Sequence, residues 1–543
     1  MQFKVTLAWL CAVRVGAASS PCDVVDLGYT LHEGSEYTSG NVHYCNFTNV
    51  HYAAPPLGSR RFKRPEMPGK NRTTQTAGPY PIQCFQATPG WFELVGQSIG
   101  NRTDIPTITP DDVPAAGKGE TEDCLVLDIL APKSVLSNKA SNVAVLVNIH
   151  GGGFVVGSKT YNGPGIGFLE AAARNGIDLV YVSINYRLGL FGFLAGAAGD
   201  GIPHNLGLLD QRLALQWVQK YIHHFGGNAN SITVTGESAG GGSILYHLGA
   251  GDVPWASLFS KAIPQSPFVA YQAQEQQTET LGRVLKAANV SSPASLKGMS
   301  SEDLRVVNGV AVGNARPYGT FAFGPVRDDD FSAYPPKVIS QWSDTDSISM
   351  MPSFNSKEGE IFASPFVKSS TKYEEYLASL FPELSDDGMT TVTKELYPAD
   401  FSGRYGYKDN VGRLAQTFGD ALIVCSAYSV NLAAQRLGHS YAYQFSVPPG
   451  VHGEDLEYIF YDWHSSGSHI NTTMAKYLQT YMTNFAVKGQ PDAERSGCAD
   501  LPSFPPAHDL TLENLNSTSI KPLEKDKLYA KRCEWWIQGL VQG

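Results

Sequence analysis

Several features are scarce in the 543-residue sequence, and each scarcity excludes a class of protein. Basic residues do not predominate, because 41 Lys and Arg stand against 51 Asp and Glu and give a formal net charge of -10. A nucleic-acid-binding protein is therefore not expected. Beyond the first twenty positions there is no run of about 20 apolar residues, so no transmembrane segment is predicted. The composition is otherwise globular, with 42% hydrophobic and 17% charged residues.

Cysteine is also scarce, with eight residues in the whole chain. None of those beyond position 20 forms the close pair, such as C-x-x-C, that a structural zinc site uses, so no metal site is predicted. Wide spacing suits a few disulfides formed in an oxidising compartment, with one thiol left over. These seven residues are Cys22, Cys45, Cys84, Cys124, Cys425, Cys498 and Cys533.

The start of the chain is typical of a secretory signal. A short positive segment ending at Lys4 precedes the apolar run 5–13, and small residues follow at 15–18. Residues 1–18 are predicted to be a signal peptide, and the protein is predicted to be secreted and extracellular. Arg14 fits this pattern poorly, so a buried N-terminal strand is the alternative. Six N-x-[ST] glycosylation sequons agree with export: Asn46, Asn71, Asn101, Asn289, Asn471 and Asn516.

Strand-like and helical segments alternate along the chain, without an internal repeat or a linker. Residues 143–149 and 179–184 are continuous apolar runs, typical of strands buried on both faces. Residues 206–224 carry apolar side chains at helical spacing, and 231–235 form a short β-branched run. This order predicts an α/β fold with a mostly parallel central sheet and helices on both faces.

The pattern G-x-S-x-G occurs twice, and structural context separates the two. A nucleophilic serine in this motif needs a strand before it and a helix after it, so that it lies exposed on a tight turn. Ser238 follows the run 231–235 and precedes a helical stretch from 241 to 248. Ser98 is followed by a sequon and by three prolines at 106, 110 and 114, which cannot continue a helix. Ser238 is the predicted nucleophile, and Ser98 is assigned to a loop.

A serine nucleophile also needs donors for the oxyanion of the tetrahedral intermediate. The run from His150 to Phe154 contains three consecutive glycines and directly follows the apolar strand ending at Ile149. Glycines there let backbone N–H groups approach a developing negative charge. The alternative is a glycine-rich turn without a chemical role.

These motifs together resemble the type-B carboxylesterase, lipase and cholinesterase family of the α/β-hydrolase fold, in its secreted fungal form. The resemblance covers nearly the whole chain after the signal and implies one catalytic domain over residues 19–543. It is carried by Y-A-A-P-P-L-G at 52–58, E-D-C-L-V-L at 122–127, H-G-G-G-F at 150–154, N-L-G-L-L-D-Q at 205–211, F-G-G-N at 225–228, E-S-A-G at 237–240 and Q-S at 265–266.

The resemblance also implies the remaining catalytic groups. Glu358 matches the family acid, which precedes a glycine, and His452 matches the base, which precedes a glycine and an acidic helix start. Glu360 is a neighbouring alternative that lacks the following glycine. By the same resemblance, the N–H groups of Gly152, Gly153 and Ala239 form the oxyanion hole, and no cofactor is required. His223, His224, His464 and His469 are assigned to surface or packing roles.

The family further implies that Cys84 pairs with Cys124 across an omega loop and that Cys425 pairs with Cys533. Cys22 and Cys45 are the remaining pair, and Cys498 is left as a free thiol. Trp91, Phe92, Leu94, Val95 and Ile99 make the loop apolar. Such a loop could be a lid that opens at a lipid interface or a fixed segment packed on the core.

The expected function is hydrolysis of neutral esters, including lipid esters, through an acyl-enzyme. The expected partner is a small-molecule ester, and oligomeric state is left open. Acyl transfer or ester processing in secondary metabolism is the alternative, and a non-catalytic adhesion or binding protein is a third. Trp91 lies at the wrong position for the choline-binding tryptophan of cholinesterases. Asp128 and Pro267 depart from the family pattern, which has Asn and Gly there.

Overall fold

The computed structural model of the chain describes residues 21–97, 102–138, 142–195, 202–250, 254–342, 348–438, 440–464 and 470–539. The predicted signal peptide at 1–18, Ser98, Ile99, the sequon at Asn101 and His469 lie outside these ranges.

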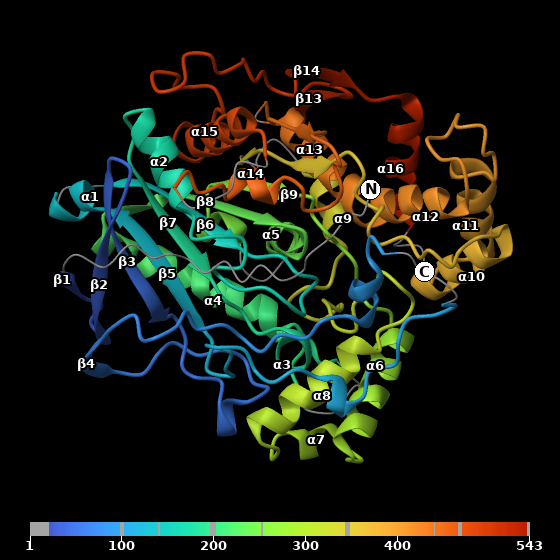
Figure 1. The fold of residues 1–543 in the computed structure, drawn as a ribbon, viewed down its shortest axis with the longest axis horizontal. Coiled ribbons are helices and arrows are strands. Elements are labelled where there is room, and N and C mark those ends of the chain that lie inside the picture. The colour runs from blue at the N-terminus through green and yellow to red at the C-terminus, as the bar shows by residue number, and fades with distance from the viewer. Residues whose placement is uncertain are drawn as a thin grey trace.

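One mixed sheet runs through the described part of the molecule (Figure 1). Its strands are β1 (Pro21–Asp26), β2 (Thr30–Ser39), β3 (Val42–His51), β4 (Asn71–Gln75), β5 (Val126–Pro132), β6 (Val143–Ile149), β7 (Leu179–Ile184), β8 (Gly227–Glu237), β9 (Lys261–Gln265), β10 (Ser349–Met350), β11 (Ser353–Asn355), β12 (Tyr443–Phe445), β13 (Thr511–Asn516) and β14 (Ser519–Glu524). The order is β1-β2-β3-β5-β7-β6-β8-β9-β11-β12-β13-β14, with β4 beside β2 and β10 beside β9. From β7 to β13 in this order the strands pair in parallel. Both ends of the sheet are antiparallel, except that β4 pairs with β2 in parallel.

The central strands match the predicted apolar runs, since β6 and β7 have the predicted bounds. Strand β8 starts at Gly227, four residues before the predicted run, because Val143 of β6 pairs with Gly227. Alternate residues of β6 enter different cores: Val145 and Val147 belong to one apolar cluster, whereas Leu146 belongs to the other. This alternation is the period of two expected for a strand covered on both faces.

Helices cover the two faces. On one face α2 (Ile166–Arg174) and α15 (Thr472–Lys488) contribute to the cluster that contains Leu146. On the other face α4 (Leu206–Tyr221) and α5 (Ala239–Gly249) contribute to the cluster that contains Val145. The predicted helix 206–224 thus ends in a short 3-10 turn, Ile222–Phe225.

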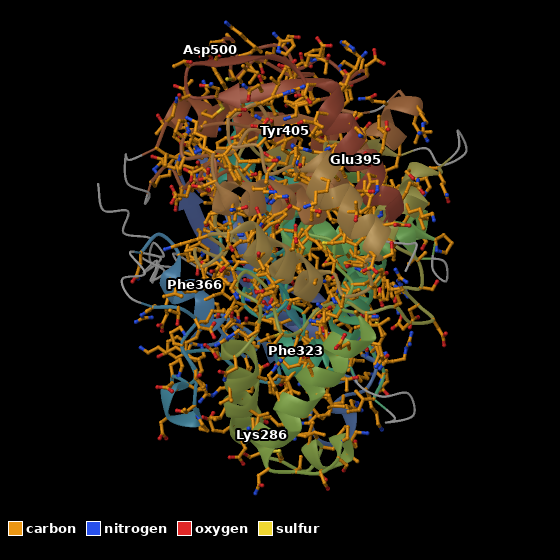
Figure 2. All side chains as sticks on the ribbon, turned by 90° about the vertical axis from the view of Figure 1, so that its right-hand side faces the viewer. Lys286, Phe323, Phe366, Glu395, Tyr405 and Asp500 are labelled. Carbon is orange, nitrogen blue, oxygen red and sulfur yellow. A yellow bond between two sulfur atoms is a disulfide. The ribbon has the colours of Figure 1, made fainter. Side chains whose placement is uncertain are left out.

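Further helices lie outside the sheet, on the side that faces the viewer in Figure 2. They include α6 (Gln274–Ala288), α8 (Ser301–Gly313), α10 (Ser370–Leu380), α12 (Asn410–Gly419), α13 (Cys425–Arg436) and α16 (Lys527–Gly539). The shorter helices of the fold are α1 (Lys133–Ser137), α3 (Gly189–Phe193), α7 (Pro293–Leu296), α9 (Pro335–Ser340), α11 (Asp386–Thr390) and α14 (Leu456–Ile459). Within the described ranges one helical run, 410–436, is long and apolar enough to cross a membrane, but 94% of its apolar window is buried, as in a core helix.

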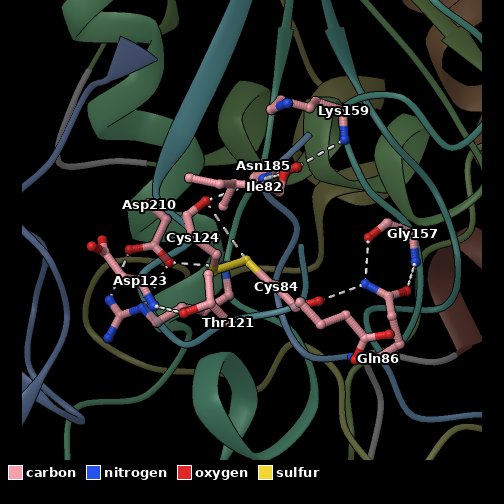
Figure 3. Close-up of a disulfide and its surroundings, with 12 residues drawn as sticks. Ile82, Cys84, Gln86, Thr121, Asp123, Cys124, Gly157, Lys159, Asn185 and Asp210 are labelled. Atoms are coloured by element: carbon pink, nitrogen blue, oxygen red, sulfur yellow. Dashed lines mark hydrogen bonds and ion pairs between the residues drawn. A yellow bond between two sulfur atoms is a disulfide. The ribbon is translucent and has the colours of Figure 1, made fainter. Parts of the chain in front are cut away.

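Three disulfides tie distant segments together. Cys22–Cys45 joins β1 to β3, Cys84–Cys124 closes the omega loop, and Cys425–Cys533 joins α13 to α16. Cys498 is a buried free thiol. Around Cys84–Cys124, the side chain of Gln86 donates to the carbonyl of Cys84 and accepts from the N–H of Gly157 at 2.7 Å (Figure 3). Gln86 therefore connects the base of the omega loop to the segment that follows the three glycines.

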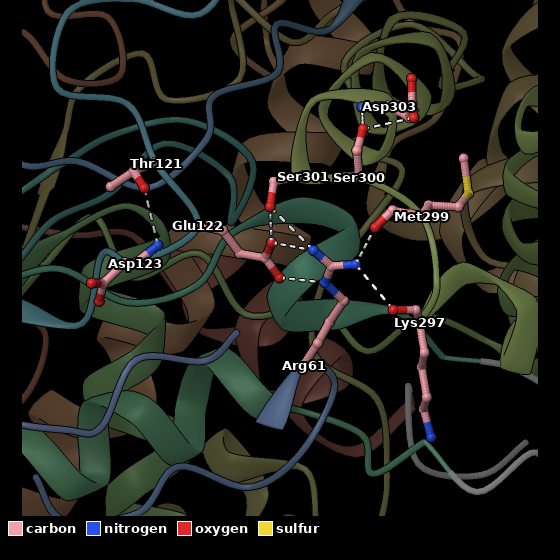
Figure 4. Close-up of polar contacts among 9 residues, drawn as sticks. All are labelled: Arg61, Thr121, Glu122, Asp123, Lys297, Met299, Ser300, Ser301 and Asp303. Atoms are coloured by element: carbon pink, nitrogen blue, oxygen red, sulfur yellow. Dashed lines mark hydrogen bonds and ion pairs between the residues drawn. The ribbon is translucent and has the colours of Figure 1, made fainter. Parts of the chain in front are cut away.

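Two buried ion pairs fix the loops around the sheet. Arg61 makes a bidentate pair with Glu122, at 2.6 Å for each bond, and donates to the carbonyls of Lys297 and Met299 (Figure 4). Asp128, which departs from the family pattern, lies 3.0 Å from the fully buried Nζ of Lys159. The pair explains how an ionised side chain is accommodated there, because a buried charge needs a partner.

Candidate active site

Ser238 lies at the junction of β8 and α5, as predicted from its strand and helix context. Its φ of 57° is in the left-handed region, which is the strained turn that exposes a nucleophile. A Cβ at Gly236 would lie 2.6 Å from the carbonyl oxygen of Ile149, and one at Gly240 would lie 2.1 Å from it. The two glycines of G-x-S-x-G are therefore required because the turn passes directly against the end of β6.

The three glycines that follow β6 form a loop against this turn. A Cβ at Gly151 would be 3.1 Å from Cβ of Ser238, so the loop adjoins the nucleophile. Gly152 and Gly153 have φ values of 105° and 59°, which favour glycine. Within the described residues their N–H groups donate to no other group. Ala239 opens α5, where the first N–H groups have no partner inside the helix.

Glu358 and His452 follow β11 and β12, at the same edge of the sheet as Ser238. Nδ1 of His452 lies 2.5 Å from Oε2 of Glu358. The other oxygen, Oε1, accepts from Oγ of Ser266 at 2.6 Å and from the N–H of Asn355. Both oxygens of this buried carboxylate are thus held, so the imidazole has a fixed orientation and tautomer. The alternative acid Glu360 is instead half exposed and pairs with Lys357 at 3.2 Å.

The opposite nitrogen of the imidazole faces the nucleophile turn. Nε2 of His452 lies 3.2 Å from Oε1 of Glu237, the residue that precedes Ser238. This nitrogen is buried and makes no hydrogen bond among the described residues. An imidazole held at Nδ1 by a carboxylate, with Nε2 directed toward the turn that carries Ser238, can act as a general base when it is neutral.

Buried carboxyl groups surround the imidazole. Burial raises the pKa of Glu237 to about 8, although His452 opposes the shift, and burial raises the pKa of Asp455 to about 6. Burial would lower the pKa of His452, but the charges of Glu237 and Glu358 together with the Glu358 hydrogen bond raise it to about 9. The environment therefore stabilises the imidazolium, which is the form that a general base reaches in the transition state. The described residues contain no group of three or more His, Cys, Asp or Glu arranged to hold a metal.

Aromatic side chains wall the site. Phe362 packs edge-on against His452 with ring centroids 5.0 Å apart. Phe321 lies so close to the three-glycine loop after β6 that a Cβ at Gly153 would meet its ring at 2.1 Å. Phe154, Phe268 and Phe321 also line a cavity of about 130 Å³ that extends toward α6 and α12.

The omega loop is packed against this wall over its described parts. Trp91 is 1% exposed, contacts the rings of Phe321 and Phe362, and donates from Nε1 to the carbonyl of Thr320 at 2.8 Å. Farther along the loop, Arg316 donates to the carbonyls of Ile105 and Pro106. These contacts favour the fixed segment over the lid that opens.

The other predicted positions lie apart from this cluster. The sequon residues Asn71 and Asn289 are exposed, whereas Asn46, Asn471 and Asn516 are half-buried. The rings of His223 and His224 contact each other near the surface with centroids 4.1 Å apart, and His464 pairs with Glu170 at 3.1 Å. Sequence reasoning gave no role to Glu237, Ser266, Asn355 or Asp455. Glu237 and Ser266 stand inside motifs already recognised, which is the signal that could have found them.

Comparisons with known proteins give the family of the chain. A model of the carboxylesterase family matches residues 22–536. A protein named carboxylesterase patB from Aspergillus clavatus is 31% identical over 550 aligned residues, which cover 96% of each chain. The protein of the same name from Penicillium expansum is 32% identical, with 96% of this chain and 97% of that chain covered. Cholinesterase of Mus musculus is 30% identical, with 90% of this chain and 82% of that chain covered.

Solved structures give the fold. EstA of Aspergillus niger matches with a TM-score of 0.77 at 24% identity, covering 94% of this chain and 97% of that chain. A thermophilic PNB esterase matches with a TM-score of 0.71 at 24% identity, covering 95% and 99%. The predicted α/β-hydrolase fold is confirmed.

Proposed function

Because the chain belongs to the type-B carboxylesterase family and is a carboxylic ester hydrolase, we propose that it acts through an acyl-enzyme with Ser238, His452 and Glu358 as its triad. The observation that carries this proposal is the fixed Glu358–His452 pair beside the strained Ser238 turn. These are the groups that serine ester hydrolysis requires.

In the proposed reaction, Oγ of Ser238 attacks the ester carbonyl while Nε2 of His452 takes its proton. The oxyanion accepts hydrogen bonds from the N–H groups of Gly152, Gly153 and Ala239, each of which typically contributes about 3 kcal/mol. His452 then gives the proton to the leaving alcohol, and the acyl group stays on Ser238. Water attacks the acyl-enzyme with His452 as base, and the acid leaves. Glu358 keeps the ring oriented and stabilises the imidazolium.

The proposed substrates are dissolved esters rather than emulsified lipids. The packing of Trp91 and the Arg316 contacts support this choice, because a lid would need these contacts to break. Secretion with glycosylation at the exposed sequons is also proposed. Three disulfides support it, since such bonds persist in oxidising compartments.

The test is hydrolysis of p-nitrophenyl esters from acetate to palmitate, with and without an emulsified interface. We expect activity that is greatest on short acyl chains, does not rise at the interface, and is abolished by Ser238→Ala. The control Ser257→Ala removes a hydroxyl from a short turn outside the site. A folded wild type without activity on any ester would refute the proposal, and activation at the interface would refute the fixed loop.

A further inference from the structure

The cavity beside the three-glycine loop at 151–153 is lined by positively charged as well as aromatic side chains. Its near wall is Phe154, Phe268 and Phe321, which adjoin the catalytic residues. Its far wall includes Arg283 on α6 and Arg316 in the following segment. Figure 2 shows this side of the molecule, with Phe323 of the cavity wall above Lys286 on α6.

The position of the cavity identifies the part of the ester that enters it. His452 must reach the leaving oxygen, so the alcohol lies on the side of the imidazole. The acyl part then extends to the other side of the carbonyl carbon, past the oxyanion loop. Phe321 touches that loop at Gly153, and the N–H of Phe268 donates to the carbonyl of Ser238 at 3.0 Å. The aromatic wall and the cavity behind it therefore face the acyl side.

The Arg283 guanidinium has weak hydrogen-bond and ion-pair partners for an arginine that lines a cavity. Nη2 donates to Oγ1 of Thr280 at 2.8 Å, but Nη1 has only Glu279 at 3.8 Å, and that glutamate is 62% exposed. Nε is buried and makes no hydrogen bond with the part of the chain that the structure describes. Burial lowers the pKa of Arg283. The Arg283 side chain is 29% exposed, and its carboxylate partner Glu279 is both distant and exposed, so the guanidinium has no short ion pair among the described residues.

Arg316 adds a second positive charge beside Arg283. Its guanidinium donates to the neutral carbonyls of Ala315, Ile105 and Pro106, and the carboxylate of Asp104 is 3.7 Å from Nε and largely exposed. Two carboxylates, Glu279 and Glu383, also line the cavity, but both are exposed to solvent. The charged residues of the cavity lining are therefore three arginines, Arg283, Arg316 and Arg327, and two solvent-exposed carboxylates.

We propose that Arg283 is a specificity-determining residue that binds a carboxylate at the far end of the acyl group. The substrate class is then the monoester of a dicarboxylic acid, whose methylene chain lies against the aromatic wall. This inference rests on the proposed ester hydrolysis and adds the nature of the acyl group. Arg283 supplies a charge-assisted hydrogen bond to the substrate from outside the reacting atoms.

The test compares pairs of esters that differ only at the acyl terminus. Mono-p-nitrophenyl esters of glutaric, adipic and suberic acid are each compared with the neutral p-nitrophenyl ester of the same chain length. We expect Arg283→Gln to lower kcat/KM on the best anionic ester by about tenfold or more, mainly through KM, and to change the neutral ester less than about twofold. Arg283→Lys should retain part of the activity, since a point charge replaces a planar fork. Lys286→Gln removes the same charge from the exposed surface of α6 and should change neither ester.

Equal effects of Arg283→Gln on both members of each pair, or no effect on either, would overturn the inference. A binding measurement separates it from the proposed reaction: monomethyl adipate is titrated into Ser238→Ala with and without Arg283→Gln. Binding to Ser238→Ala that depends on Arg283, together with a folded wild type that hydrolyses no ester, would retain the anion site and refute the proposed reaction. Ester hydrolysis without Arg283-dependent binding would retain the hydrolase and refute the anion site.

Discussion

Replacing Glu237 with Gln should move the pH profile of ester hydrolysis to lower pH. The base works in its neutral form, so kcat/KM rises with pH as His452 loses its proton. In the wild type the pKa of His452 is raised to about 9, with burial opposing and the charges of Glu237 and Glu358 favouring the increase. Glu237→Gln removes one of these charges and keeps the shape of the side chain. The pKa of His452 must therefore decrease, and the acid limb of the profile must move to lower pH.

The size of the shift follows from the 3.2 Å between Oε1 of Glu237 and Nε2 of His452. Two unit charges at that distance interact by about 1 kcal/mol in water and by about 5 kcal/mol at an effective dielectric constant of about 20. One pKa unit corresponds to about 1.4 kcal/mol, so the apparent pKa of the acid limb should decrease by at least about one unit. The plateau should also fall, because the imidazolium of the transition state loses a stabilising charge.

The assay is kcat/KM for p-nitrophenyl butyrate from pH 6 to 10, with p-nitrophenolate release corrected for its own ionisation. In the wild type the limb reports the coupled titration of His452 and Glu237, whose pKa is itself raised to about 8 by burial. The matched control is Glu360→Gln, which removes a half-exposed carboxylate paired with Lys357 and should leave the limb in place. If the apparent pKa of the acid limb in Glu237→Gln stays within a few tenths of a unit of the wild-type value, the reasoning is refuted.

Three further changes test the supports of the site. Ser266→Ala removes a hydrogen bond to Glu358, the proposed acid of the triad, so kcat should fall about tenfold with KM nearly unchanged in steady-state kinetics; an unchanged kcat would contradict this role. Lys159→Met leaves Asp128 buried without its partner and should lower the free energy of unfolding by about 3 kcal/mol or more in urea titrations, whereas combining it with Asp128→Asn should restore most of the loss. If the double variant is as unstable as the single one, the pair is not the cause. Replacing Cys425 and Cys533 together with Ser opens a cross-link spanning 108 residues, for which about 2–5 kcal/mol of stability is expected to be lost; a loss under about 1 kcal/mol would contradict the assignment.

The sequence predicted the parts of the site that depend on local chain order. Ser238 was separated from Ser98 because only Ser238 has a strand before it and a helix after it, and the structure has both elements. Glu358 and His452 have no such local signature, and they came only from the resemblance to a family. Nothing in local spacing places a residue at 237 within 3.2 Å of one at 452.

The fold shows the same division between local and distant information. The apolar runs of β6 and β7 were predicted with their bounds, since both faces of these strands are covered. The antiparallel end of the sheet and the Cys22–Cys45 link to β3 depend on pairing between segments whose patterns are weakly periodic. The sequence also does not predict the Asp128–Lys159 ion pair, because nothing in either segment indicates that the two side chains lie together.

The proposed catalytic residues and the residues that line the cavity belong to different parts of the fold. Ser238, Glu358 and His452 lie on segments that follow β8, β11 and β12, whereas Arg283 and most of the cavity wall belong to helices and loops outside the sheet. Substrate choice can therefore diverge by exchange of the outer segments between relatives while the reaction centre is inherited unchanged. The same separation gives protein engineers a region, from α6 to the loop before β10, in which libraries can be built without altering the strands that hold the chemistry.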